Sequence, residues 1–215
     1  SFEKKKGKEA PPKLFDLTAL QVECNKKFGY TADDTLRYIQ NLYEKKMVTY
    51  PRVDTTFLPT DMYPKIAGIL KNMEPYANFT APLLQAKIKK STKVFDDKKI
   101  TDHHAIVPTG VKPGGLILEE KRVYDLIARR FIAAFYPDCI VSNTTVMGKV
   151  EKHQFRATGK VIVDDGWRVL YAKKESDEDA EPGDDEQQLM PSFVKGESGE
   201  HEPDLLEKQT QPPKM

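Results

Sequence analysis

The sequence predicts an α+β protein in which a helical region is followed by an antiparallel, β-rich region. Two observations predict this order. In the first third of the chain, apolar residues recur at the three- and four-residue spacing of amphipathic helices. From Cys139 onward, apolar and polar residues tend to alternate, which is typical of strands with one buried face.

The first two helices each have a start signal of their own. Asp16 can cap a helix whose apolar stripe runs to Phe28, and Gly29 stands where a left-handed residue commonly ends a helix. Thr31, followed three residues later by Asp34, resembles a capping box that opens a second helix ending near Lys46. The short turn between them suggests a helix-turn-helix unit.

Two further helices are expected. Thr60 can cap a third, which stops before Pro75, and residues 123–134 form one more amphipathic helix that ends at Pro137. Beyond it, residues 144–150, 153–163 and 166–172 are predicted to be antiparallel strands, and Leu205 with Leu206 to begin a last one.

Composition excludes several classes of protein. The chain has 215 residues and 39% hydrophobic residues, and it contains no run of about 18 apolar residues that could cross a membrane. Its two cysteines form no CxxC pair, which argues against a zinc ribbon or a disulfide framework. A cytoplasmic location is therefore expected.

The net charge of +1 hides an asymmetry along the chain. Residues 1–110 contain 19 Lys and Arg against 13 Asp and Glu, a net +6, and this stretch can face a polyanion. Residues 173–187 hold 8 acidic and 2 basic residues, have no aromatic residue, and are predicted to form an acidic loop.

The stretch TYPRVDTTFLP, residues 49–59, is the first that suggests chemistry. Pro51 disfavours helical geometry at Tyr50, and in an extended chain Tyr50, Arg52 and Asp54 point to the same side. A phenol can attack a phosphodiester, and a guanidinium can hold the phosphate; Asp54 is expected to orient Arg52. Taken alone, the stretch also fits a half-buried strand tyrosine beside an ordinary exposed ion pair.

The second such stretch is DHHAIVPTG, residues 102–110. His103 and His104 could donate to a phosphate or carry a proton, or they could be a structural pair. Neighbouring residues of an extended chain point to opposite faces and only two other histidines remain, so no metal site is predicted in the chain.

Together these motifs resemble the type IA DNA topoisomerase family, and the double histidine favours its topoisomerase III branch. The family shows a TYxRTDS-like element around its catalytic tyrosine and an AHxAIxPT-like element around an active-site histidine. PPKLFDLTALQ, the DGW step, LMPSFVKGE and LLEKQTQPP resemble further segments of the family, so the likeness covers nearly the whole chain.

The resemblance assigns roles residue by residue. It implies that Tyr50 is the nucleophile, that Arg52 binds the phosphate and that His103 is the active-site histidine. Three residues depart from the usual pattern: Val53 replaces a threonine, Thr55 a serine and Asp102 an alanine. The remaining DNA contacts that we expect are Gln40, Tyr43, Asp54, Thr55 and His104.

The resemblance also implies a fold. A helical tyrosine domain with a winged-helix-like, CAP-like core would be inserted in a β-rich arch domain. Residues 1–13 would be a strand segment of the arch, residues 14–115 the helical catalytic-tyrosine domain, and residues 116–215 the helix and strands of the arch.

The implied reaction is a transesterification in which one DNA strand is cut through a 5′-phosphotyrosyl link, another strand passes, and the cut is resealed without ATP. The implied partners are single-stranded DNA, the rest of the same polypeptide and a helicase. An acidic toprim domain would supply Mg²⁺, and the sequence lacks its motif. The chain is therefore expected to be a fragment that holds no cofactor and is inactive alone.

One alternative is a winged-helix DNA-binding module without catalysis, in which Tyr50 only packs. It accounts for the basic helical region but not for the Tyr-Pro-Arg and His-His motifs. An inert interaction scaffold is a second alternative, and it would need no charge asymmetry.

Overall fold

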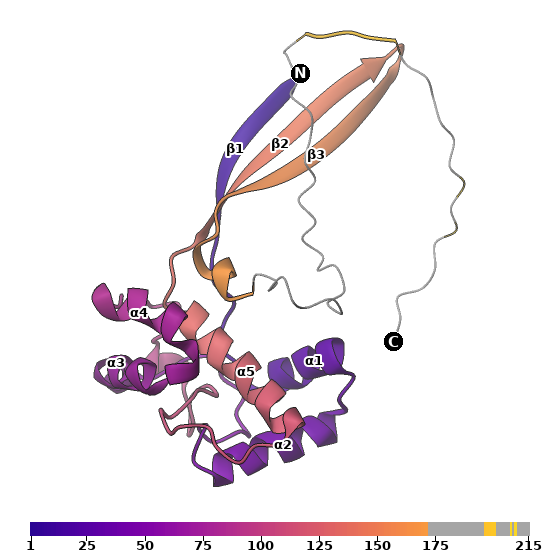
Figure 1. Ribbon diagram of the computed structural model, residues 1–215. Coiled ribbons are helices and arrows are strands. Elements are labelled where there is room, and N and C mark those ends of the chain that lie inside the picture. Colours follow the sequence, from indigo (N-terminus) through magenta and orange to yellow (C-terminus); the bar gives the residue numbers. More distant parts are fainter. Residues whose placement is uncertain (172–195, 201–206, 208, 210–215) are drawn as a thin grey trace. The chain divides into compact units, whose positions relative to one another are not determined.

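The computed structural model describes residues 1–171, 196–200, 207 and 209. This part of the chain forms two compact units (Figure 1). A helical unit contains Lys8–Ile140 and continues from Val163 to Tyr171, and a sheet unit contains Ser1–Gly7 and Val141–Ile162. The predicted acidic loop at 173–187 and the predicted strand at Leu205 and Leu206 lie outside the described residues.

Helices and strands both occur, as the α+β prediction requires. The described strands form one antiparallel sheet in the order β1-β2-β3, with β2 and β3 joined as a hairpin. The strands are β1 (Phe2–Glu9), β2 (Cys139–Val150) and β3 (His153–Asp164). The helices are α1 (Leu17–Phe28), α2 (Ala32–Glu44), α3 (Tyr63–Asn72), α4 (Ala77–Gln85) and α5 (Leu118–Ala133), with short 3-10 turns at Thr60–Met62, Glu74–Tyr76, Asp97–Lys99 and Gly166–Leu170.

The first two helices begin and end where the sequence predicts. The Asp16 carboxylate accepts a hydrogen bond from the backbone N–H of Ala19, and Gly29 ends α1 in the left-handed region at φ 69°. Thr31 caps α2 by accepting from the N–H of Asp34. Both predictions are confirmed.

The predicted cap at Thr60 is wrong. Its N–H and its hydroxyl both donate to the carboxylate of Asp97, at 2.8 Å each, so Thr60 opens a 3-10 turn and α3 begins only at Tyr63. A long-range contact has replaced the local one. The helix α4, which contains Pro82, was not predicted at all.

The predicted strand at 166–172 is also wrong, because Gly166–Leu170 is a 3-10 turn. Gly166 has φ +51°, and a Cβ there would meet the carbonyl oxygens of Pro137 and Asp138 at 2.6 and 2.7 Å. Trp167 donates its backbone N–H to Pro137 and its indole N–H to the carbonyl of Glu9. These contacts curl the chain instead of extending it.

The main hydrophobic core lies in the helical unit. In Figure 1, α1 and α2 lie beside α5, and α3 and α4 lie near the C-terminal end of α5. Fully buried side chains from three of these helices meet in the centre: Leu20, Ile39, Leu42, Ile127 and Phe131.

A buried carboxylate joins α2 to α5. Glu120 is 2% exposed and accepts from Lys45 Nζ at 2.6 Å and Asn41 Nδ2 at 3.0 Å, as well as from the backbone N–H of Ile117. Burial alone would raise the pKa of Glu120, but these three donors outweigh it and hold the pKa below its ordinary value.

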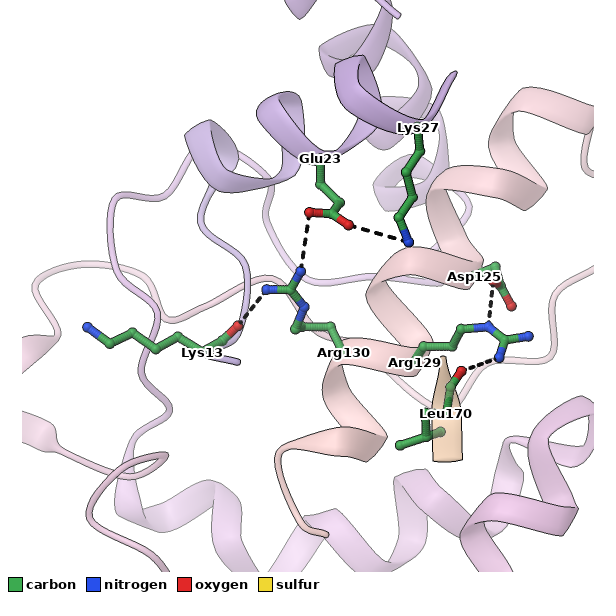
Figure 2. Close-up of polar contacts among 7 residues, drawn as sticks. All are labelled: Lys13, Glu23, Lys27, Asp125, Arg129, Arg130 and Leu170. Carbon is green, nitrogen blue, oxygen red and sulfur yellow. Dashed lines mark hydrogen bonds and ion pairs between the residues drawn. The ribbon is translucent and has the colours of Figure 1, made fainter. Parts of the chain in front are cut away.

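Two adjacent arginines of α5 hold two distant segments of the helical unit, as Figure 2 shows. Arg129 donates to the Asp125 carboxylate at 2.7 Å and to the carbonyl of Leu170. Arg130 donates to the carbonyl of Lys13 at 3.2 Å and pairs with Glu23 of α1 at 3.6 Å. One turn of α5 thus fixes the chain near both Lys13 and Leu170.

No helix within the described ranges has the length and apolar character needed to cross a bilayer.

Candidate active site

The loop that carries Tyr50 starts at an unusual helix end. Lys46 adopts a left-handed conformation with φ 60°, and the N–H of Met47 reaches back to the carbonyl of Leu42. This closes α2 with the geometry that glycine usually supplies. Met47 and Val48 are then buried, so the chain is anchored immediately before Tyr50.

Thr49 ties the tyrosine segment to the histidine segment. Val48 and Pro108 form an antiparallel bridge, and the N–H of Thr49 donates to the carbonyl of Val107 at 3.0 Å. The Thr49 hydroxyl donates to the carbonyl of Ala105 at 3.1 Å and accepts from the N–H of Val107 at 3.0 Å. Two segments more than fifty residues apart in the sequence are therefore held in register beside Tyr50.

Sequence reasoning missed this role of Thr49. A threonine before a tyrosine carries no signal of a long-range backbone contact, so only the position of the second segment reveals it.

The ring of Tyr50 contacts two other rings at the site. The centroids of Tyr50 and His103 are 4.4 Å apart with the rings tilted by 39°, and the ring of Tyr43 meets Tyr50 edge-on at 5.5 Å. Tyr50 is half-buried and packs against the core, whereas Tyr43 and His103 are exposed. Within the described residues the Tyr50 hydroxyl has no hydrogen-bond partner, and it is not sealed from solvent. The phenol oxygen is therefore open to a substrate.

Arg52 follows Tyr50 by two residues and contacts Gln40 of α2. Burial alternates from Pro51 to Thr55, with Arg52 and Asp54 exposed and Val53 buried, as an extended segment requires. Arg52 Nη2 approaches Gln40 Oε1 at 3.5 Å, a long contact that leaves most of the guanidinium donors open. No ion pair joins Arg52 to Asp54 in the part of the chain described, so the expected orienting role of Asp54 is not realised.

Some of the other predicted DNA contacts have side chains at the surface, and others have side chains that face the interior. Both Gln40 and Tyr43 lie on α2, where Tyr43 contacts the ring of Tyr50 and Gln40 contacts Arg52. Thr55 is only 7% exposed and donates its hydroxyl to the carbonyl of Lys99 at 2.7 Å, so its side chain faces inward. His104 is half-buried, with Nδ1 2.9 Å from the carbonyl oxygen of Ala105.

The site does not fit a magnesium ion by itself. Asp54 is the one carboxylate among the predicted site residues, while Mg²⁺ prefers several oxygen ligands. No group of three or more His, Cys, Asp or Glu side chains that could hold a metal occurs in the described ranges. What these residues can offer is a nucleophile in contact with an imidazole, and a cation two residues along the chain.

The fold places this site in a known architecture. The topoisomerase I of Thermotoga maritima, solved at full length, matches with a TM-score of 0.61 over 87% of this chain and 31% of its own, at 22% identity. At that identity the likeness concerns the fold alone, which is the mixed helix-and-sheet fold of that enzyme class.

Comparison of the sequences identifies the family more specifically than comparison of the folds. The family profile described as DNA topoisomerase matches residues 1–215. DNA topoisomerase 3 of Bacillus licheniformis is 38% identical over 196 residues, which cover 89% of this chain and 26% of the relative. DNA topoisomerase 3 of Bacillus subtilis gives 38% over 196 residues, 89% and 27%. The chain belongs to the type IA DNA topoisomerase family, as its motifs predict, and it spans about a quarter of the length of these relatives.

Proposed function

We propose that this chain carries the strand-cleaving tyrosine of a topoisomerase III-like enzyme, with Tyr50 as nucleophile. The observation that supports it most directly is the Tyr50 side chain, whose ring contacts those of Tyr43 and His103 and whose hydroxyl has no hydrogen-bond partner in the described part of the chain. A nucleophile needs this access, and a phosphate needs a nearby cation.

In the proposed reaction, the Tyr50 oxygen forms a bond to a backbone phosphorus and the bond from phosphorus to the 3′ oxygen breaks. The phenol loses its proton, the 3′ oxygen gains one, and the 5′ phosphate stays on Tyr50. Arg52 binds the phosphate oxygens, whose negative charge grows in the transition state. His103, which is in ring contact with Tyr50, would donate to the same phosphate or carry the proton.

The link retains the energy of a phosphodiester, so the reverse step reseals the strand without ATP. Passage of another strand between the two steps changes the DNA topology. We assign Mg²⁺ to a toprim domain elsewhere in the longer polypeptide, where it would stabilise the negative charge of the reacting phosphate.

Several finer expectations belong to the same proposal. They are the winged-helix-like core, its insertion in an arch domain with the boundaries given above, DNA contacts at Gln40, Tyr43, Asp54, Thr55 and His104, a cytoplasmic location and a helicase partner. For Thr55 and His104, the inward contacts favour support of the loop over direct contact with DNA.

The deciding experiment is capture of the covalent adduct. The chain, expressed within its full-length polypeptide, is incubated with a single-stranded oligonucleotide labelled at its 3′ or its 5′ end and then denatured. A 5′-phosphotyrosyl link predicts labelled protein with the 3′ label only. Tyr50→Phe should abolish the adduct, and Arg52→Ala should reduce its rate of formation by about 100-fold or more.

Tyr43→Phe is the matched control, because it removes a neighbouring phenol oxygen and keeps the ring that touches Tyr50. An adduct that survives Tyr50→Phe would refute the nucleophile assignment. Normal DNA binding with no adduct in any variant would favour the non-catalytic DNA-binding module. The 215-residue chain alone is expected to give no relaxation of supercoiled DNA.

A further inference from the structure

A broad groove lies in the helical unit, and none of the predicted site residues lines it. It has a volume of about 1360 Å³ and is lined by residues of α4, the segment that follows it, the segment before α1 and the turns after α5 and β3. Small-molecule sites commonly fill roughly 300 to 1,000 Å³, so a larger or elongated ligand fits this groove better.

The rim of the groove is basic. Six lysines line it, against three aspartates. Asp138 lies 3.9 Å from Lys93, and Asp164 accepts from the N–H of Gly166, so two of the three carboxylates are already engaged. The lysines are Lys8, Lys13, Lys87, Lys89, Lys93 and Lys99.

Several of these cations remain available. Lys13, Lys87 and Lys89 are exposed, and they form no ion pair within the described ranges. Lys99 is already engaged, because it pairs with Asp96 at 3.6 Å and lies 4.4 Å above the ring centroid of Phe57, which also lines the groove. The groove therefore presents an excess of positive charge to any ligand.

The floor is apolar. Leu83 and Val94 are buried beneath it, and Ile88 and Phe135 are half-buried along it. An apolar floor between lysines matches a ligand with flat apolar faces and regularly spaced negative charges. Unpaired nucleotides have this combination, whereas a duplex hides its bases.

The groove is connected to the site of Tyr50 through the chain itself. Thr55 bonds to the carbonyl of Lys99, and Phe57 follows Arg52 by five residues. Five extended residues span at most about 18 Å, so one strand of several nucleotides can touch both Arg52 and the groove.

We propose that this lysine-lined groove is a second binding surface for single-stranded DNA. It adds to the proposed function a contact with the strand that lies beyond Tyr50. The contact concerns binding only and does not depend on Tyr50 being the nucleophile.

The test measures the affinity of the 215-residue chain for a fluorescent thymidylate oligonucleotide of about 20 residues and for a duplex of equal length, over a range of salt concentrations. The groove variant combines Lys13→Ala, Lys87→Ala and Lys89→Ala. The control combines Lys26→Ala, Lys65→Ala and Lys71→Ala, which remove the same charge from exposed positions outside the groove.

The groove variant should lose about tenfold in affinity for the single strand near ~0.1 M salt, and its salt slope should fall by about 2, since each lost phosphate contact accounts for roughly 0.7. The control should lose much less. Both proteins should keep the melting temperature of the unmodified chain.

Equal losses in the two variants, no loss in either, or equal affinity for duplex and single strand would each overturn the proposal. These outcomes are separate from the adduct experiment. Loss of the adduct in Tyr50→Phe, together with unchanged binding in the groove variant, would leave the proposed function standing and remove the groove from it.

Discussion

The two units differ in what holds them together. The main hydrophobic core lies wholly in the helical unit, whereas in the described part of the sheet unit Val141 is the one large apolar side chain that is buried. The sheet instead exposes apolar residues such as Phe2, Met147 and Phe155. Apolar burial is the dominant favourable term in folding, so the helical unit is built to be stable from its own residues, whereas the described part of the sheet unit buries too little apolar surface for this.

The most direct test of this difference in burial is to remove one phenylalanine from each unit. Phe131 is fully buried in α5, and Phe155 of β3 is 53% exposed. Phe131→Ala should lower the free energy of unfolding by about 3 to 5 kcal/mol, because it leaves a cavity. Phe155→Ala should cost less than about 1 kcal/mol. Urea titration followed by circular dichroism measures both, and similar losses would show that burial does not separate the units.

Two glycines, one in each unit, allow the same comparison to be made for the backbone. Gly166→Ala would place a Cβ against the carbonyls of Pro137 and Asp138 at a positive φ, so we expect a loss of about 2 to 4 kcal/mol. At Gly148 in β2, by contrast, an added Cβ would meet no heavy atom within 4 Å. Gly148→Ala should therefore leave the melting temperature nearly unchanged. A tolerated Gly166→Ala would contradict the tight turn after β3.

The buried carboxylate between α2 and α5 predicts a dependence on pH. The folded pKa of Glu120 is held below its unfolded value, so its contribution to stability is present above that unfolded value, near ~4.3, and is lost as the pH falls through the folded pKa. Glu120→Gln should cost about 1 to 3 kcal/mol near neutral pH and should flatten the loss of stability in acid.

Urea midpoints measured from neutral pH down to about pH 3 follow this effect. Glu44→Gln is the control, since Glu44 is exposed at the end of α2. A pH profile that is the same in Glu120→Gln and in the unmodified chain would remove Glu120 as a link between the two helices.

The smallest expected effect is a gain in stability. Lys46 holds a left-handed conformation at the end of α2, which costs a non-glycine residue about 1 to 2 kcal/mol. Lys46→Gly should therefore raise the stability of the helical unit by about 1 kcal/mol. Lys46→Ala keeps the strain and should give no gain. Equal urea midpoints for the Gly and Ala variants would contradict the helix end described here.

Local signals explain which parts of the fold the sequence predicts well. Asp16, Gly29 and Thr31 act on backbone groups within four residues of themselves, so α1 and α2 could be placed from the chain alone. Thr60 carries the same kind of signal, but Asp97 competes for it from 37 residues away. The turn at Gly166 likewise depends on backbone that lies near Pro137.

The site, too, is predicted well only where local sequence signals determine it. Alternation predicts that Arg52 and Asp54 share a face, and the structure agrees. The closeness of Tyr50 and His103 was expected only from the family motifs, because no local rule connects residues 53 positions apart. The hydroxyl of Thr49 supplies that connection, through backbone contacts that periodicity and composition do not encode.

The arginine pair of α5 has a mechanical consequence. Arg129 holds the carbonyl of Leu170 and Arg130 that of Lys13, and the two arginines are neighbours on one helix. A force that pulls these two segments apart would act on both hydrogen bonds at once. The force would be transmitted from one segment to the other through a single turn of α5. The segment after Lys13 is also bonded to the loop that carries Tyr50, because the N–H of Leu17 donates to the carbonyl of Val53 at 3.1 Å, so the same tension would reach the tyrosine loop.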